Sequence, residues 1–377
     1  MEQQHQKFLL LGICFATFAA TTNNAFAESD ANITLYGTVD YGYAIRFNKN
    51  KKIDDSNEFS KTNSRLNGGQ SDSNKIGIRG SENFGNGNKA VFVLEREFLL
   101  DTGSEDGWTQ TFVGIENEKL GSVFGGYMDS LHYSLISELD PFKAGTVGNY
   151  ANVRGDIYDG IFHISSVKNS LIYISPNVAN FTFSAMYSNN MDDEDSPTKN
   201  NTNDNFYNLA VNYEGEKFTF GASYHYINFG NKQNEFLENS NTKNLHNFTL
   251  GGAYEFDNEL KISAFVAYDK LNFKKNSPQI SNSKNIALTH IMLGAEKPFG
   301  RHNIKGSLNY SHNKKSQFGK AWQIAVGYDY NFSKRTNFYA AYSYIKNNNA
   351  RAVATHDFQN EGGIYQQGLQ FGIKHNF

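Results

Sequence analysis

Residues 368–377 read GLQFGIKHNF, and the way their side chains alternate points to the fold. Leu369, Phe371, Ile373 and Phe377 fall on one face together with a single histidine, whereas the other face is polar or glycine. A period of two is typical of a strand with different surroundings on its two sides. An apolar strand that ends a chain is expected to have its edge paired, as in a closed barrel, although a terminal strand of a soluble sandwich has the same pattern.

Residues 32–47 show the same alternation with a charged second face. Ile33 and Leu35 lie on the apolar face, while Tyr36, Asp40 and Arg46 lie on the opposite one. In a transmembrane barrel this polar face lines an aqueous lumen and the apolar face meets lipid. We therefore predict Tyr36 and Asp40 as lumen side chains and Arg46 as a basic residue of the pore wall.

The rhythm repeats along the whole chain. Short turns alternate with long loops, and the long loops are predicted at 48–71, 130–165, 191–203, 230–244, 273–284 and 348–365. This sorting is typical of an all-β transmembrane antiparallel barrel with turns at one end and loops at the other. The pattern predicts about 16 strands, at residues 32–47, 75–82, 90–100, 108–118, 121–129, 166–176, 180–190, 203–214, 216–229, 244–256, 259–272, 285–297, 302–313, 320–332, 336–347 and 366–377.

The first 27 residues have the pattern of a secretory signal peptide. Lys7 precedes a short apolar run, and Ala25-Phe26-Ala27 forms an A-x-A site, so cleavage is expected before Glu28. The barrel domain is then predicted at 28–377. The one cysteine, Cys14, belongs to the removed segment, which leaves no disulfide framework and no thiol chemistry.

Composition agrees with a barrel that has a wet interior. Hydrophobic residues make up 39% of the chain and aromatic residues 15%, with 22 Tyr and 31 Phe but only 5 Pro. The hydrophobic content is below the average of globular domains, so one large dry core is not expected. No cofactor motif and no metal-ligand spacing is present, and the scattered histidines do not suggest an enzyme.

Six segments of the chain carry a family resemblance when taken in order. They are ITLYGTVD at 33–40, KIGIRGSENFGNG at 75–87, FVGI at 112–115, GSVFGG at 121–126, NSLIYISP at 169–176 and the terminal Phe377. Together they are similar to the general diffusion porins of Gram-negative bacteria, most of all to the Neisseria and Haemophilus type. The resemblance implies a 16-stranded barrel, a homotrimer, and a third loop folded into the lumen as a constriction.

The resemblance also implies where the channel charges lie. Basic side chains are expected on the barrel wall, and acidic ones opposite them on the third loop, here 130–165. The wall candidates are Lys75, Arg79, Lys168 and Arg46. The loop candidates are Glu138, Asp140, Asp156, Asp159 and Arg154.

This sequence departs from the family pattern at two wall positions. Thr109 and Ser166 stand about where further wall arginines are common. The second loop, about 102–107, is short, so a trimer contact is expected mainly in the barrel walls. With fewer wall cations, anion preference is expected to be weaker or reversed, since the charges in the lumen set the local field. The sequence leaves the sign of selectivity open.

The resulting expectation is an outer-membrane channel for passive diffusion of ions and small hydrophilic solutes, not an enzyme. A substrate-specific sugar channel and a mainly structural or adhesive barrel are the alternatives. The expected partners are outer-membrane lipid and lipopolysaccharide, and the assembly machinery of the outer membrane. By the resemblance, Phe377 is the signal that this machinery reads.

Overall fold

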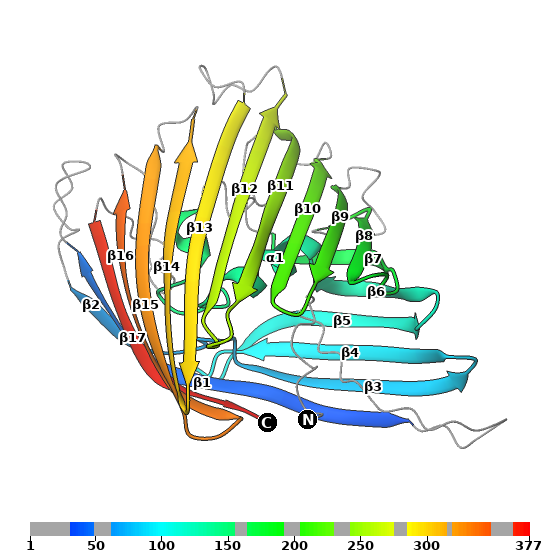
Figure 1. Cartoon of the computed structure of the whole chain (residues 1–377), viewed down its shortest axis with the longest axis horizontal. Helices are drawn as coiled ribbons and strands as arrows, with labels where there is room; N and C mark the ends of the chain where they lie inside the picture. The colour runs from blue at the N-terminus through cyan, green and yellow to red at the C-terminus, as the bar shows by residue number, and fades with distance from the viewer. Residues whose placement is uncertain are drawn as a thin grey trace.

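The computed structural model describes residues 31–48, 62–154, 164–191, 204–229, 242–274, 285–314, 319–347 and 365–377. Strands dominate it (Figure 1). They are β1 Asn32–Asn48, β2 Asn63–Gly68, β3 Lys75–Gly85, β4 Asn88–Phe98, β5 Glu105–Asn117, β6 Gly121–Asp129, β7 Ser166–Ile174, β8 Phe181–Ser188, β9 Asn205–Glu214, β10 Phe218–Asn228, β11 Thr242–Glu255, β12 Lys261–Phe273, β13 Asn285–Phe299, β14 His302–Asn313, β15 Lys320–Asn331, β16 Thr336–Asn347 and β17 Tyr365–Asn376. Between β6 and β7 lie helix α1, Leu131–Leu139, and the 3₁₀ helix η1, Tyr150–Val153.

The strands close into a ring through the two ends of the chain. β17 pairs antiparallel with β1 from Thr38 opposite Asn376 to Asn48 opposite Gln366, and the two strands lie side by side in Figure 1. The remaining neighbours pair antiparallel in sequence order from β3 to β17. The terminal strand predicted from residues 368–377 is thereby confirmed as the closing strand of a barrel.

β2 and β3 share one position in the ring. Both pair with the same side of β1, since β2 faces Tyr41–Arg46 and β3 faces Asn32–Thr38. The 17 strands of the sheet therefore give a barrel of 16 positions, as the sequence predicted. Residues 69–74 interrupt this shared position.

The prediction was wrong for residues 63–68, which were included in the loop 48–71. They form β2, although their sequence, NSRLNG, has neither apolar alternation nor β-branched residues. Their pairing with β1 imposes the extended conformation. Tertiary pairing overrides weak local propensity in such strands.

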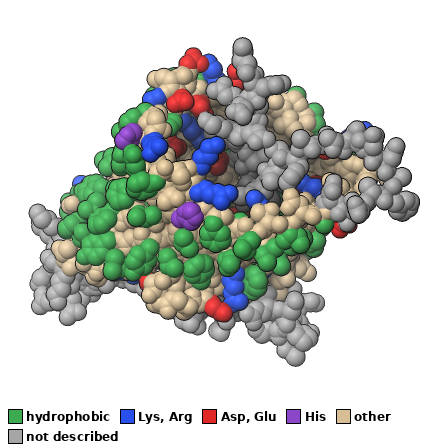
Figure 2. Space-filling view, turned by 90° about the horizontal axis from the view of Figure 1, so that it is seen from below, with side chains coloured by type: hydrophobic (Ala, Val, Ile, Leu, Met, Phe, Trp, Pro, Cys, Tyr) green, Lys and Arg blue, Asp and Glu red, His purple; other side chains and the backbone are tan. Residues whose placement is uncertain are grey.

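The two faces of the barrel differ as the alternation predicted. On β15, Trp322, Ile324 and Val326 are each more than half exposed, while Gln323 and Ala325 between them are buried. Hydrophobic side chains of this exposed kind form a broad band in Figure 2, and Lys and Arg side chains gather toward the middle of that view. The band is the lipid-facing surface expected of an outer-membrane barrel.

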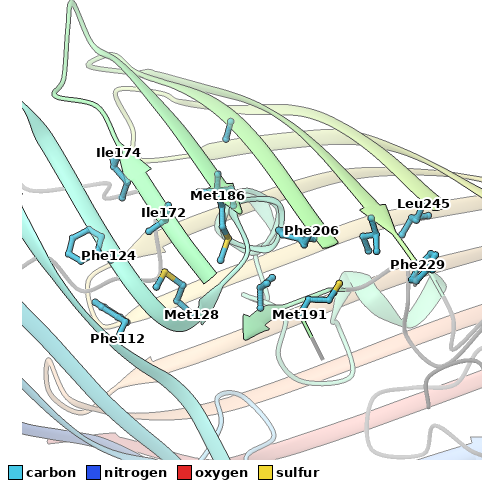
Figure 3. Packing of buried hydrophobic residues seen from close by; sticks show 14 of the residues in the cluster. Phe112, Phe124, Met128, Ile172, Ile174, Met186, Met191, Phe206, Phe229 and Leu245 are labelled. Carbon is cyan, nitrogen blue, oxygen red and sulfur yellow. The ribbon is translucent and has the colours of Figure 1, made fainter. Parts of the chain in front are cut away.

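Part of the inner face differs from the wet interior that composition suggested. A cluster of buried apolar side chains covers the inner face from β4 to β13 (Figure 3). Phe112 and Phe124 pack edge to face with ring centroids 5.5 Å apart, and Leu131 of α1 joins the same cluster. Composition missed this cluster because it averages over the whole chain, whereas the 18 buried side chains of the cluster gather on one part of the inner face.

Candidate functional site

The segment after β6 folds back against the inner face of the barrel. Ser130 caps the start of helix α1, and its Oγ accepts a hydrogen bond from the backbone N–H of Tyr133 at 3.0 Å. This N-cap satisfies one of the free donors at the start of the helix. The buried side of α1, with Leu135, Ile136 and Leu139, packs against the inner face of β9 to β12. The helix therefore lies flat on the wall.

Glycines in the wall leave room for this segment. A Cβ at Gly221 or Gly251 would lie only 2.4 or 2.5 Å from Leu135 or Leu139 of α1. Two further wall glycines lie against the residues that follow the helix. A Cβ at Gly294 would lie within 2.8 Å of Pro141, and one at Gly327 within 2.8 Å of Phe142. We call Gly221, Gly251, Gly294 and Gly327 the glycine track. It fixes where the loop crosses the wall.

Hydrogen bonds attach the loop to the wall along most of its path. Asn208 on β9 accepts from His132 N at 3.1 Å, and Ser263 on β12 donates to Leu139 O at 2.6 Å. Farther on, Gln323 of β15 donates to Gly148 O at 2.8 Å, and Gln370 of β17 accepts from Val147 N at 2.5 Å. The loop thus spans the inner wall from β9 to β17.

Two of the predicted loop charges are buried and hold the loop together. Asp140 accepts backbone hydrogen bonds from Phe142, Ala144 and Tyr150 at 3.1–3.3 Å. Burial raises the pKa of Asp140 to about 6, although these hydrogen bonds lower it. Arg154 forms an ion pair with a carboxylate of β12.

Glu138 is the predicted loop carboxylate that stays partly exposed. Its Oε1 lies 2.9 Å from Lys143 Nζ and 3.8 Å from Lys261 Nζ. Asp156 and Asp159 lie outside the described residues. In the part of the loop that the structure describes, the exposed charges are therefore mixed in sign.

Lys75 lies at the start of β3 among acidic residues. Asp72, Glu95, Glu97 and Asp129 all act on its ammonium electrostatically, and Asp72 Oδ1 is 3.6 Å from Nζ. We call these five residues the wall cluster. Four carboxylates against one ammonium give it a formal charge of −3. The predicted basic wall position thus lies inside an acidic patch.

Thr109 and Ser166, where the resemblance suggested arginines, bind members of the wall cluster. Thr109 Oγ1 donates to Glu95 Oε1 at 2.9 Å, and Ser166 Oγ donates to Asp129 Oδ1 at 3.2 Å. Hydroxyls that donate to a carboxylate favour its charged form. The two departures therefore belong to the same acidic patch.

The wall cluster lies close to the folded-back segment after β6, residues 130–154, which we call the inward loop. Burial raises the pKa of Tyr133 on α1, and the nearby carboxylates of Asp129, Asp72 and Glu97 raise it further. Tyr133 is thus within electrostatic reach of the wall cluster from the loop side. These facing groups are the candidate constriction.

The other three predicted wall cations lie on β3, β1 and β7. The guanidinium of Arg79 stacks over the ring of Tyr36 at 5.2 Å. Arg46 is buried near the C-terminal end of β1. Lys168 lies on β7 directly before Asn169, whose φ of 50° interrupts the alternation of the strand. The buried side chain next to Lys168 is that of Val167. The structure does not bring these three cations together with Lys75.

The acidic members of the wall cluster were missed at the sequence level. Glu95 and Glu97 are two residues apart on a predicted strand, so both carboxylates fall on one face. The spacing of Glu95 and Glu97 could therefore have predicted this part of the cluster.

Among the described residues, no helix is long and apolar enough to cross a membrane. Within the same ranges, no three His, Cys, Asp or Glu side chains are arranged to hold a metal ion.

Comparison with known proteins gives matches over nearly the whole chain. A family model described as Gram-negative porin matches residues 15–350. An outer membrane porin protein of Bordetella pertussis is 28% identical over 91% of this chain and 94% of its own length. A major outer membrane protein P.IB of Neisseria lactamica is 27% identical over 81% of this chain and 86% of its own. The fold is similar to that of an anion-selective porin from Comamonas acidovorans, with a TM-score of 0.74 and 23% identity, over 92% of this chain and 100% of that one.

Proposed function

The chain belongs to the Gram-negative porin family and forms an outer-membrane channel for passive diffusion of ions and small hydrophilic solutes, and we propose that this channel prefers cations. The preference arises where the inward loop faces the wall cluster. The observation that supports it is the set of four carboxylates around Lys75. Burial and mutual repulsion favour protonation of Asp129 and Glu97, but the cluster remains negative with both of them neutral.

The field in the narrowest part of a pore decides which ions pass. The part of the loop that the structure describes contributes little net charge there, because Glu138 is paired with Lys143 and lies near Lys261. The carboxylates of the wall cluster are not balanced in this way, since they share one ammonium. A cation entering the constriction therefore gains attraction that an anion does not.

The test is the reversal potential across a planar bilayer in a potassium chloride gradient. We expect wild type to pass potassium over chloride, and the double variant Glu95→Gln/Glu97→Gln to lower that ratio by about two- to fivefold at 0.1 M salt, where the Debye length is about 10 Å. Lys75→Gln should raise the ratio. The matched control is Lys217→Gln, which removes the same charge from an exposed turn where Lys217 pairs with Asp257.

A reversal potential of the opposite sign in wild type would contradict the proposal. So would equal effects of Lys75→Gln and Lys217→Gln, because charge at the constriction would then have no special weight. Saturable block of the conductance by one sugar would favour the substrate-specific alternative. The proposal requires no catalytic chemistry.

The expected processing and partners are part of the same proposal. Removal of residues 1–27 predicts a mature protein that begins at Glu28, which mass spectrometry of the outer-membrane protein checks. A homotrimer and contact with lipopolysaccharide are likewise proposed. Recognition of the last strand by the assembly machinery is supported by Phe377, which remains 41% exposed while its backbone N–H donates to Gly37 O at 3.0 Å.

A further inference from the structure

The turn 69–74 interrupts the second position of the barrel and folds inward. On β1, the partner of Gly68 is Tyr41 and the partner of Lys75 is Thr38. Six residues therefore stand opposite two, and the excess chain has to leave the sheet. Gln70 and Asn74 are buried, which places the turn against the inside of the barrel. We call residues 69–74 the inward turn.

Asp40 binds the inward turn from the wall. Its Oδ2 accepts the backbone N–H groups of Ser71 at 2.5 Å and Asp72 at 2.9 Å, and its Oδ1 accepts the hydroxyl of Tyr339 on β16 at 2.6 Å. The side chain of Asp40 has no exposed surface. Three donors on a buried carboxylate make a specific anchor, because an ionised carboxylate only accepts and has two oxygens to share.

The wall around Asp40 is shaped for these contacts. A Cβ at Gly42, two residues along the same face, would lie 2.9 Å from both the hydroxyl of Tyr339 and the side-chain oxygen of Gln70. Asn74 closes the arrangement from the other side, since its Oδ1 accepts from the backbone N–H of Asp40 at 2.6 Å. Asp40 is therefore tied to both ends of the inward turn.

The inward turn supplies groups to the wall cluster and the loop. Its Asp72 is the carboxylate 3.6 Å from Lys75, and its Ser73 hydrogen-bonds Glu97. Gln70 O accepts a hydrogen bond from the backbone N–H of Thr146 in the inward loop. The turn thus joins the two sides of the candidate constriction.

We propose that Asp40 is a positioning residue of the constriction, which holds the inward turn in place so that Asp72 stays beside Lys75 and the loop stays braced at Thr146. Asp40 does not itself line the ion path, because its side chain is fully buried. The effect of Asp40 on ion selectivity rests on the proposed cation preference. Its role in holding the inward turn does not depend on that preference.

The first arm of the test measures the anchor directly. Asp40→Asn keeps the shape but removes the negative charge and replaces one acceptor oxygen by an NH₂ group. The backbone N–H groups of Ser71 and Asp72 only donate, so the remaining oxygen has to face them while the NH₂ group faces the Tyr339 hydroxyl. We expect amide exchange of 69–74, followed by mass spectrometry on the folded protein in lipid, to rise at least about tenfold because charge-assisted hydrogen bonds are lost. Thr38→Val is the matched control, since it removes a hydrogen bond to Asn376 from the same face of β1.

Tyr339→Phe provides a milder second variant. It removes one donor and leaves the carboxylate and both backbone contacts, so we expect a smaller rise in exchange of the inward turn. This variant keeps the proposal testable if Asp40→Asn does not fold. If the amides of 69–74 exchanged at the wild-type rate in both variants, the proposal would be overturned.

The second arm measures the channel. In Asp40→Asn we expect a lower potassium-to-chloride permeability ratio and more open-channel noise than in Thr38→Val. If exchange rises while wild type shows no cation preference, the positioning role stands and the proposed selectivity fails. If wild type prefers cations and Asp40→Asn changes neither exchange nor noise, the selectivity stands and the positioning role fails.

Discussion

Nη2 of Arg154 at the end of the inward loop lies 2.8 Å from Oδ2 of Asp269 on β12, and neither side chain is more than 1% exposed. Asn247 on β11 also donates to Asp269, at 2.7 Å to the other oxygen. This buried pair attaches the end of the inward loop to the wall, whereas helix α1 attaches its beginning.

Loss of one partner of this pair should loosen the loop. Asp269→Leu leaves the guanidinium of Arg154 buried without its carboxylate, and removing one member of a buried pair costs about 3–5 kcal/mol. We expect faster amide exchange at 150–154. The double variant Arg154→Met/Asp269→Leu buries no charge and should exchange more like wild type. An equal rise in the single and double variants would contradict the role of the pair.

The glycine track predicts a steric effect on the loop. Gly221→Val places carbon atoms where Leu135 of α1 now packs, since even a Cβ would lie 2.4 Å from its Cδ1. We expect the helix to shift and single-channel conductance to become heterogeneous. Gly125→Val is the control because the nearest atom to a Cβ there is 3.8 Å away. Identical conductance histograms for the two variants would count against the track.

Asp140 predicts a pH dependence of the loop. Burial raises its pKa to about 6 from the usual value of 3.8, so the closed loop binds a proton more tightly than the opened loop does. Its contribution to loop stability is therefore complete below about pH 4 and is lost as the pH rises through about 6. We expect the free energy of opening at 142–150 to fall by on the order of 2 kcal/mol between pH 4 and 7.

Amide exchange at 142–150, corrected for the intrinsic pH dependence of exchange, measures this change. Asp140→Asn cannot ionise, and its opening free energy should vary less with pH than that of wild type. A wild-type loop that becomes more stable from pH 4 to 7 would show that the assigned sign is wrong.

The strands were predictable because alternation is a local property of the sequence. The terminal stretch at 368–377 shows it, as does 320–332, and the structure confirms both as strands. β2 was not predictable in this way, because its extended form depends on pairing with β1. Local pattern thus identifies strands that separate two solvents and misses those that tertiary contacts create.

The candidate site was less accessible to sequence reasoning for a physical reason. Lys75 was found from its face and from the family resemblance, but its field depends on Asp72, Glu97 and Asp129, which reach it from three other segments. Asp40 was predicted as a lumen side chain, whereas the structure buries it under the inward turn. Alternation predicts which face of the sheet a side chain lies on, but it does not predict which other segments of the chain cover that side chain.

The wall cluster predicts that selectivity can be shifted at Thr109. Its hydroxyl now donates to Glu95 at 2.9 Å, and Thr109→Arg would place a permanent cation beside that carboxylate. Because lumen charges set the local field, we expect the potassium-to-chloride permeability ratio to fall by about two- to fivefold, which corresponds to about 0.4–1 kcal/mol. Thr109→Val removes the hydrogen bond without adding charge and should change the ratio much less. Equal ratios for Thr109→Arg and Thr109→Val would mean that ions do not sense the charge beside Glu95, and the constriction would then have to lie elsewhere in the lumen.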